Sequence, residues 1–326
     1  MIANKNKALV DKIQRMQDCA RSSARTYASV IRRLGNLFAP KKFNEDLKWV
    51  TNPGILEKIK KFDTTLHARR NLVNGMIIAL RLNPNKSLSE KYVAYLKELN
   101  KQVEDQARSG KLTAKQSAKW LSFKKIVALR KLLAKQLRLS QSYDRKTLRA
   151  KDHRLITQHL VICLYTMTSP VRLDWATVKW TTEKGFQNIA RSSGNHLVIR
   201  RSGMQVYWTS FKTAKTMKEV VTDIPKPLAK VIRKYLKWQK KWFPDTNHLL
   251  LNSKYEPMSR MSLGAFLTNI FKTYYGKRIS ASQLRLIFLS HHFSHDEDKK
   301  RERIAREMHH SLGTQKLHYV KKPDAE

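Results

Sequence analysis

Apolar side chains recur every three or four positions from Ala8 to about Leu137, and this spacing constrains the fold more than any other feature of the sequence. The segment "SARTYASVIRRLGNLF", for example, places Tyr27, Ile31 and Leu34 on one side of a helix. Proline and glycine are scarce and fall between such segments. The pattern predicts that the chain begins with a lysine-rich module of four or five helices.

A domain boundary is indicated by the stretch "QARSGKLTAKQSAKW" at 106–120. It contains a Ser-Gly pair and few large apolar residues, and Trp120 then opens a new helical pattern. A chain of 326 residues is also longer than one hydrophobic core usually supports. We therefore predict a helical domain at 1–110, a linker at 111–117 and a second domain at 118–326.

The residue composition of the sequence changes between His196 and Pro225. The segments "HLVIRR", "QVYWTSFK" and "KEVVTDIP" are short and rich in β-branched and aromatic residues, and turn-forming residues separate them. They predict a three-stranded antiparallel sheet, after which helical patterns resume. The expected fold class is therefore mainly α with a small antiparallel β-sheet (α+β).

The charge of the chain points to a polyanionic partner. Lysine and arginine number 66 against 25 acidic residues, which gives a formal net charge of +41. Such a charge repels itself unless a polyanion offsets it. Because the cations run from Lys5 to Lys322 without a long gap, rather than gathering on one amphipathic helix, nucleic acid is favoured over a membrane surface.

Targeting and redox signals place the expected protein inside the cell, with DNA. Cys19 and Cys163 are too few for a disulfide scaffold and form no CxxC motif. The N-terminal segment lacks the apolar core of a signal peptide, and no apolar run approaches the length of a membrane span. We expect a soluble protein that is not secreted, located in a host nucleus or cytoplasm or packaged in a virion.

A metal site is not expected. Several histidines gather near the C-terminus, but they have neither the spacing of a zinc site nor a partnering cysteine. These histidines are His291, His292, His295 and His309.

Four segments of the second domain carry residues suited to breaking a DNA strand without a metal. Such a reaction needs a nucleophile that stores the phosphodiester energy in a covalent bond, cations on the phosphate oxygens and a group that protonates the leaving oxygen. Arginine suits the phosphate because its planar fork donates two parallel hydrogen bonds. The residues are Arg172 in "TSPVRLDWATVKW", Lys212 at the end of "QVYWTSFK", Arg285 in "SASQLRLIF", and His310 and Tyr319 in "MHHSLGTQKLHY".

The order and spacing of these residues resemble the tyrosine recombinases, or phage-type integrases. Their signature is an arginine after a helix, a lysine in a β-hairpin, a His-x-x-Arg pair, a Gly-His-Ser turn and a tyrosine nine residues after that histidine. Two positions depart from it, because Ser282 replaces the first histidine and His309 replaces the glycine. The resemblance implies a helical core-binding domain followed by a tyrosine-recombinase catalytic domain.

The resemblance also implies a mechanism. Tyr319 would attack the scissile phosphate to form a 3′-phosphotyrosyl link, Arg172 and Arg285 would hold the phosphate oxygens, and Lys212 would protonate the leaving 5′ oxygen. His310 would bond the phosphate, helped by Ser282. The expected activity is integration or excision of a viral or mobile element at double-stranded DNA recombination sites, by a homotetramer, with no cofactor, small-molecule substrate or membrane.

Several alternatives stay open from the sequence. Lys215 in the same hairpin competes with Lys212, Asp174 is either a surface acid or a residue that holds Arg172, and Tyr319 taken alone is more often a packing residue. A type IB topoisomerase or a telomere resolvase would use similar chemistry. A basic DNA-packaging or architectural protein with a decayed site would use none.

Overall fold

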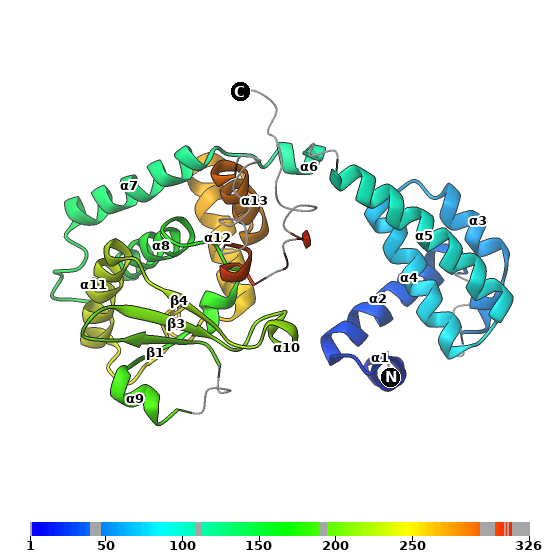
Figure 1. Cartoon of the computed structure of the whole chain (residues 1–326), viewed down its shortest axis with the longest axis horizontal. Coiled ribbons are helices and arrows are strands. Elements are labelled where there is room, and N and C mark those ends of the chain that lie inside the picture. Colours follow the sequence, from blue (N-terminus) through cyan, green and yellow to red (C-terminus); the bar gives the residue numbers. More distant parts are fainter. Residues whose placement is uncertain are drawn as a thin grey trace. The chain divides into compact units, whose positions relative to one another are not determined.

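The computed structural model describes residues 2–39, 47–108, 112–189, 194–293, 304–309, 311 and 313–314. The chain divides into two compact units, Met1–Ser109 and Gly110–Glu326 (Figure 1). Both are largely helical and the second carries a small sheet, so the predicted fold class, mainly α with a small β-sheet, is confirmed. None of the helices in the described ranges is long and apolar enough to cross a lipid bilayer.

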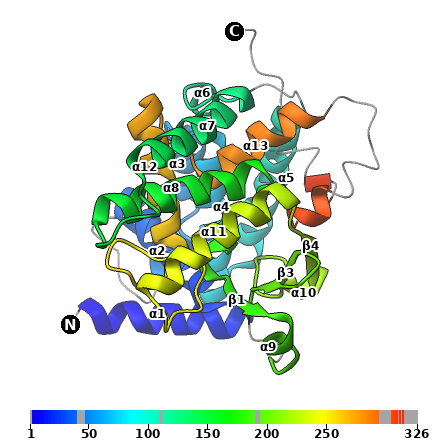
Figure 2. The same ribbon diagram turned by 90° about the vertical axis from the view of Figure 1, so that its left-hand side faces the viewer.

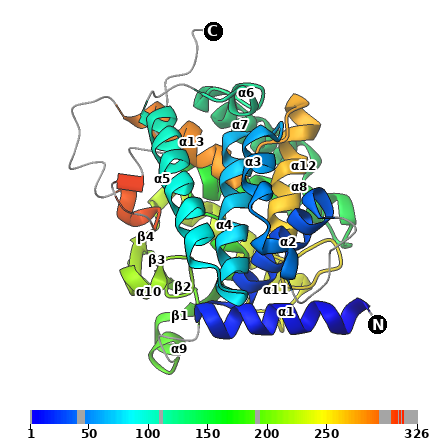
Figure 3. The same cartoon turned by 90° about the vertical axis from the view of Figure 1, so that its right-hand side faces the viewer.

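Unit 1 is a helical bundle over its described residues. Its helices are α1 (Ile2–Gln17), α2 (Arg21–Phe38), η1 (Lys48–Thr51), α3 (Gly54–Lys61), α4 (Leu66–Leu82) and α5 (Lys86–Arg108). The sequence spacing accounts for the packing, because α2 buries Ala24, Ala28 and Ile31 on one face. Helix α4 packs against both α2 and α5, and Figure 3 shows it between them.

Unit 2 alternates helices with short strands. Its elements are α6 (Ala114–Ser117), α7 (Phe123–Ser140), α8 (Ala150–Thr166), η2 (Asp174–Thr177), β1 (Lys179–Thr182), α9 (Glu183–Gln187), β2 (His196–Ile199), β3 (Met204–Trp208), α10 (Ala214–Met217), β4 (Val220–Asp223), α11 (Lys226–Trp242), α12 (Arg260–Tyr275) and α13 (Ala281–His292). Helix α6 lies inside the stretch that the sequence suggested as a linker. Its N-cap residue, Thr113, forms a capping box with Gln116.

Helix α8 is the centre of unit 2. Its residues from Ile156 to Thr166 are all buried, and it packs against α7, α11 and α12. A helix that is buried on every side needs neighbours on every side. The Ser169-Pro170 pair follows its C-terminal end, where proline cannot continue the helix, and Arg172 comes two residues later with a partly exposed side chain.

The sheet corrects the expectation in one respect. Strands β2, β3 and β4 pair antiparallel as predicted, but β1 adds parallel to β2, so the sheet is mixed and has the order β1-β2-β3-β4. Strand β1 has four residues and three of them are only partly buried, so it lacks the alternation that marks a strand in sequence. Its partner is β2, and helix α9 separates the two strands in the sequence, so their pairing cannot be read from neighbouring residues.

The two ends of the sheet lead to different parts of unit 2. Trp208 pairs with Val220 at one end, and the chain continues from Trp208 toward Ser210 and Lys212. Ile199 pairs with Met204 at the opposite end, where Arg200 to Gly203 form the β2–β3 turn. The candidate site lies at the Trp208 end.

Candidate active site

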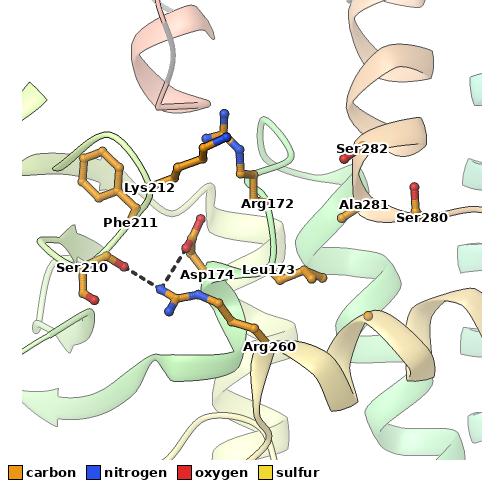
Figure 4. Close-up of a pocket in the computed structure, with 11 residues that line it drawn as sticks. Arg172, Leu173, Asp174, Ser210, Phe211, Lys212, Arg260, Ser280, Ala281 and Ser282 are labelled. Atoms are coloured by element: carbon orange, nitrogen blue, oxygen red, sulfur yellow. Dashed lines mark hydrogen bonds and ion pairs between the residues drawn. The ribbon is translucent and has the colours of Figure 1, made fainter. Parts of the chain in front are cut away.

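A cavity of about 500 Å³ opens where four segments of unit 2 meet (Figure 4). These segments are the stretch after α8, the stretch after β3, the first turn of α12 and the first turn of α13. The lining side chains drawn and labelled in Figure 4 are Arg172, Leu173, Asp174, Ser210, Phe211, Lys212, Arg260, Ser280, Ala281 and Ser282. Four residues predicted from the sequence, Arg172, Asp174, Lys212 and Ser282, therefore line one cavity.

Arg172 and the stretch after β3 meet at one backbone carbonyl. Arg172 Nη1 donates to the carbonyl oxygen of His309 at 3.5 Å, and Thr213 Oγ1 donates to the same oxygen at 2.6 Å. Tyr165, in α8, donates its hydroxyl to the Arg172 carbonyl. Thr213, which follows Lys212, is thus hydrogen-bonded to the same carbonyl oxygen as the guanidinium of Arg172.

Arg285 holds the neighbouring carbonyl. Its side chain is fully buried within α13, and Nη2 donates to the Met308 carbonyl oxygen at 3.0 Å. Arg285 is not among the described residues that line the cavity. Both predicted arginines therefore contact successive carbonyls of the 304–309 segment, but only Arg172 faces the open space.

The backbone of His309 has a conformation that glycine usually adopts. Its φ is 58°, in the left-handed region where glycine is the usual residue. The imidazole is fully buried, with its ring centroid 4.0 Å from that of Phe211 and 5.3 Å from that of Trp208. We attribute the tolerance of histidine at this backbone angle to that packing.

Asp174 is paired with an arginine that the sequence did not single out. Arg260 Nη2 lies 3.1 Å from Asp174 Oδ1 and 2.8 Å from the carbonyl oxygen of Ser210. The Asp174 side chain is 4% exposed, whereas that of Arg260 is 45% exposed. Arg260 thus joins the stretch that carries Arg172 to the stretch that carries Lys212, and Asp174 is a buried, paired acid rather than a surface acid.

Burial controls the ionisation of Asp174. Desolvation raises the pKa of its carboxyl, because the charged form loses hydration. The nearby charge of Arg260 opposes this rise, and so do the charges of Arg172 and Arg285. A buried carboxylate surrounded by cations can keep those cations in place without cancelling their total charge.

Arg260→Ala is expected to make the free energy of unfolding fall more steeply as pH rises. An acid whose pKa is higher in the folded state contributes full stability below its ordinary value of 3.8, and that stability is lost as pH rises through the folded pKa. Removing Arg260 raises the pKa of Asp174 further, so the loss grows. We expect roughly 1–2 kcal/mol at neutral pH, since the exposed guanidinium is partly screened.

Denaturant unfolding at about pH 4 and pH 7 measures this difference. Arg278→Ala, which removes an exposed arginine just beyond the other end of α12, serves as the matched control. Equal pH dependence in Arg260→Ala and Arg278→Ala would contradict the assigned ion pair.

Of the remaining residues predicted from the sequence, Lys215 and Ser282 are described by the structure and the others are not. Lys215 lies in α10, is exposed and is not among the described residues that line the cavity. Ser282 is exposed in the first turn of α13, where Ser280 caps the helix by accepting a hydrogen bond from the Gln283 amide. His310 and Tyr319 lie outside the described residues, and so does His295.

The described histidines near the C-terminus pack against aromatic rings. His291 and His292 pack against Phe123, with ring centroids 5.0 and 5.1 Å away. No group of three or more His, Cys, Asp or Glu side chains suited to a metal occurs among the residues that the structure describes.

Comparison with known proteins gives a likeness in structure but none in sequence. No protein-family model matches the chain, and no curated protein matches it. A solved structure titled "Crystal structure of XerA recombinase" aligns over 98% of this chain and 94% of its own, with 10% sequence identity and a TM-score of 0.42.

Proposed function

We propose that the chain is a DNA strand transferase that cuts and rejoins duplex DNA as a site-specific recombinase. One observation carries the proposal. Arg172, Arg285 and the residue after Lys212 all bond to the Met308 and His309 carbonyls, immediately before His310. The segments that carry Arg172, Lys212 and Arg285 thus meet at the beginning of the segment that carries His310 and Tyr319. The net charge of +41 supplies the affinity for the DNA backbone.

The proposed reaction conserves the number of phosphodiester bonds. The Tyr319 hydroxyl gives up its proton to the solvent as its oxygen attacks the scissile phosphorus, a tyrosyl O–P bond forms and the bond to the 5′ oxygen breaks. Lys212 gives a proton to that oxygen, and the strand is held as a 3′-phosphotyrosyl ester. The 5′ hydroxyl of a second duplex then reverses the step, so strands are exchanged without an external energy source.

The lining of the cavity supports separate tasks for the cations. Arg172 faces the cavity, so its fork can bind the non-bridging oxygens of a phosphate placed there. Arg285 is buried, does not line the cavity and donates Nη2 to the Met308 carbonyl, so its guanidinium would have to turn toward the cavity to complete the clamp. His310 and Ser282 would bond the same phosphate, and Asp174 with Arg260 would hold the two stretches that carry Arg172 and Lys212.

The finer parts of the proposal are a homotetramer on two DNA sites and a role in moving a viral or mobile element. They rest on the resemblance drawn from the sequence. The target is expected among inverted repeats in the DNA that flanks the gene.

The direct test is covalent capture on nicked suicide duplexes built from that flanking DNA. The nick releases a short strand after cleavage, so rejoining fails and the adduct accumulates. A protein–DNA adduct that survives detergent and disappears with protease supports the proposal. Absence of any adduct would favour an architectural protein, and relaxation of supercoiled plasmid without strand exchange would favour a topoisomerase.

Lys212→Ala is expected to lower the rate of strand cleavage by about 10²-fold or more, because a general acid is lost. Lys212 lines the cavity, whereas Lys215 does not, so Lys215→Ala is the matched control. A duplex with sulfur at the 5′ bridging position should restore the rate of Lys212→Ala, since a thiolate leaves without a proton. If sulfur instead rescues Lys215→Ala, Lys215 is the acid.

A further inference from the structure

The exposed side of α11 consists almost entirely of cations. Apart from Pro227, every exposed residue of this helix is a lysine or an arginine, and no acidic residue interrupts them. We call this surface the α11 basic face; it consists of Lys226, Lys230, Arg233, Lys234, Lys237, Lys240 and Lys241.

The α11 basic face has no acidic partner within the described part of the chain. None of its seven cations forms an ion pair with a described Asp or Glu. Several contact neutral groups instead: Lys234 lies over the Tyr143 ring, and Lys240 over the Trp180 ring. Each cation has another three or four positions away, an arrangement that costs a few tenths of a kcal/mol, roughly 0.2–0.5, for each pair. A polyanion would offset that cost.

This face is separate from the cavity that holds Arg172 and Lys212. Strand β4 begins at Val220, which pairs with Trp208 near the cavity, and ends at Asp223, which pairs with Gln205. Helix α11 follows, so it starts at the opposite end of the sheet. Arg233 Nη2 donates to the Arg200 carbonyl at the β2–β3 turn, which lies at that same end.

A second hollow borders the α11 basic face. Lys230 and Lys234 line a cavity of about 590 Å³ together with Arg138 of α7, and it shares no lining residue with the candidate active site. In Figure 1, α11 lies at the left of unit 2, whereas α10 lies at its right. Figure 2, viewed from that left side, shows α11 in front, running across the helical layer.

The residue types of the α11 basic face indicate which class of partner it binds. A membrane-bound helix needs an exposed apolar side to enter the lipid, but most apolar residues of α11 are buried in the core of unit 2, and the other two, Val231 and Trp242, are partly buried against it. An interface with a folded protein usually centres on apolar or aromatic anchors, and the face presents none. The row from Lys226 to Lys241 is about 22 Å long at 1.5 Å per residue, and duplex DNA carries one charge per roughly 1.7 Å.

We propose that the α11 basic face binds a second segment of duplex DNA while the candidate active site engages the first. This inference rests on the proposed function in taking DNA as the substrate at the active site. It gives one protein molecule two DNA contacts on different sides of unit 2, and so a way to bring two duplexes together before any strand is exchanged.

The test is a bridging assay with the full-length protein. A short biotinylated duplex is fixed to beads and bound by the protein, and capture of a second, fluorescent duplex is measured. The test variant is Lys230→Gln with Lys237→Gln, since neither side chain makes a hydrogen bond or ion pair with a described residue and glutamine keeps the helix propensity. Lys254→Gln with Lys272→Gln removes the same charge from exposed sites outside α11.

The Lys230/Lys237 variant is expected to capture the second duplex on the order of tenfold less well at about 0.1 M salt. The slope of log affinity against log salt for this step should fall in size by about 2, one phosphate contact for each lysine. Binding to the bead-fixed duplex should match that of the Lys254/Lys272 variant.

Three results would overturn the inference. Bridging could be equal in the two variants, which would assign it to contacts between protein molecules. Both DNA-binding steps could weaken together, which would make α11 part of the primary surface. Binding to phosphatidylserine vesicles could fall while bridging stays intact, which would make the face a lipid surface. The adduct assay reports separately on the proposed function, because bridging requires no chemistry.

Discussion

Tyr319→Phe is expected to abolish the covalent adduct between the protein and a nicked suicide duplex. Phenylalanine keeps the size of the side chain and removes only the hydroxyl oxygen that would form the phosphate ester. No partial activity is expected, because a missing nucleophile cannot be replaced by the arginines that stabilise the charge. The measurement is a denaturing gel on which adduct and free strand are resolved over time.

The control for this variant is Tyr27→Phe, which removes a hydroxyl from α2 in unit 1. It should form adduct at the wild-type rate, and both variants should bind the duplex as tightly as the unaltered chain. Adduct that persists in Tyr319→Phe would mean that another residue is the nucleophile, and peptide mapping of the adduct would then identify it.

The helices were the most predictable part of the molecule, since a helix that covers a core must repeat its apolar residues at helical spacing. Helix α2 illustrates this, because the periodic residues Ile31 and Leu34 are buried as expected. Strand β1 could not be found in this way. Four residues with little burial carry no such repeat, and their partner in β2 lies beyond an intervening helix.

The hairpin that carries Lys212 was predicted only in outline. Strand β3 ends at Trp208, four residues before Lys212, and the connection from there to β4 contains the short helix α10. The sequence "QVYWTSFK" continues its β-rich composition past the last paired residue, so composition alone placed the strand end too late. The consequence is functional, because Lys212 sits in a connecting stretch tied down through Thr213 rather than in the sheet.

Arg260 and Arg285 show a second limit on what could be predicted from the sequence. In a chain with 66 lysines and arginines, an isolated Arg260 carries no signal, and only its contacts with Asp174 and Ser210 distinguish it. Arg285 stands in the segment "QLRLIFL", all of which is buried. Helical spacing cannot tell which way an arginine points inside such a segment, so its bond to the Met308 carbonyl had to come from the structure.

Arg172→Ala is expected to slow strand cleavage on the order of 10³-fold or more while duplex binding changes little. One arginine among many contributes a small share of the affinity for the backbone, but a donor placed at the reacting phosphate is worth about 10²–10³-fold in rate, and an arginine at a phosphoryl group up to about 10⁵-fold. Arg172→Lys should recover only part of the rate, because lysine keeps the charge and loses the planar fork.

Single-turnover cleavage on the suicide duplex measures the effect, and Arg154→Ala, which removes an exposed arginine from α8, is the matched control. Thermal unfolding identifies any variant that fails to fold, which is relevant because Arg172 also bonds the His309 carbonyl. If folded Arg172→Ala cleaves within tenfold of Arg154→Ala, the cavity does not hold the reacting phosphate. In that case the contact of Arg172 with the 304–309 segment is structural, and the site of chemistry lies elsewhere in the chain.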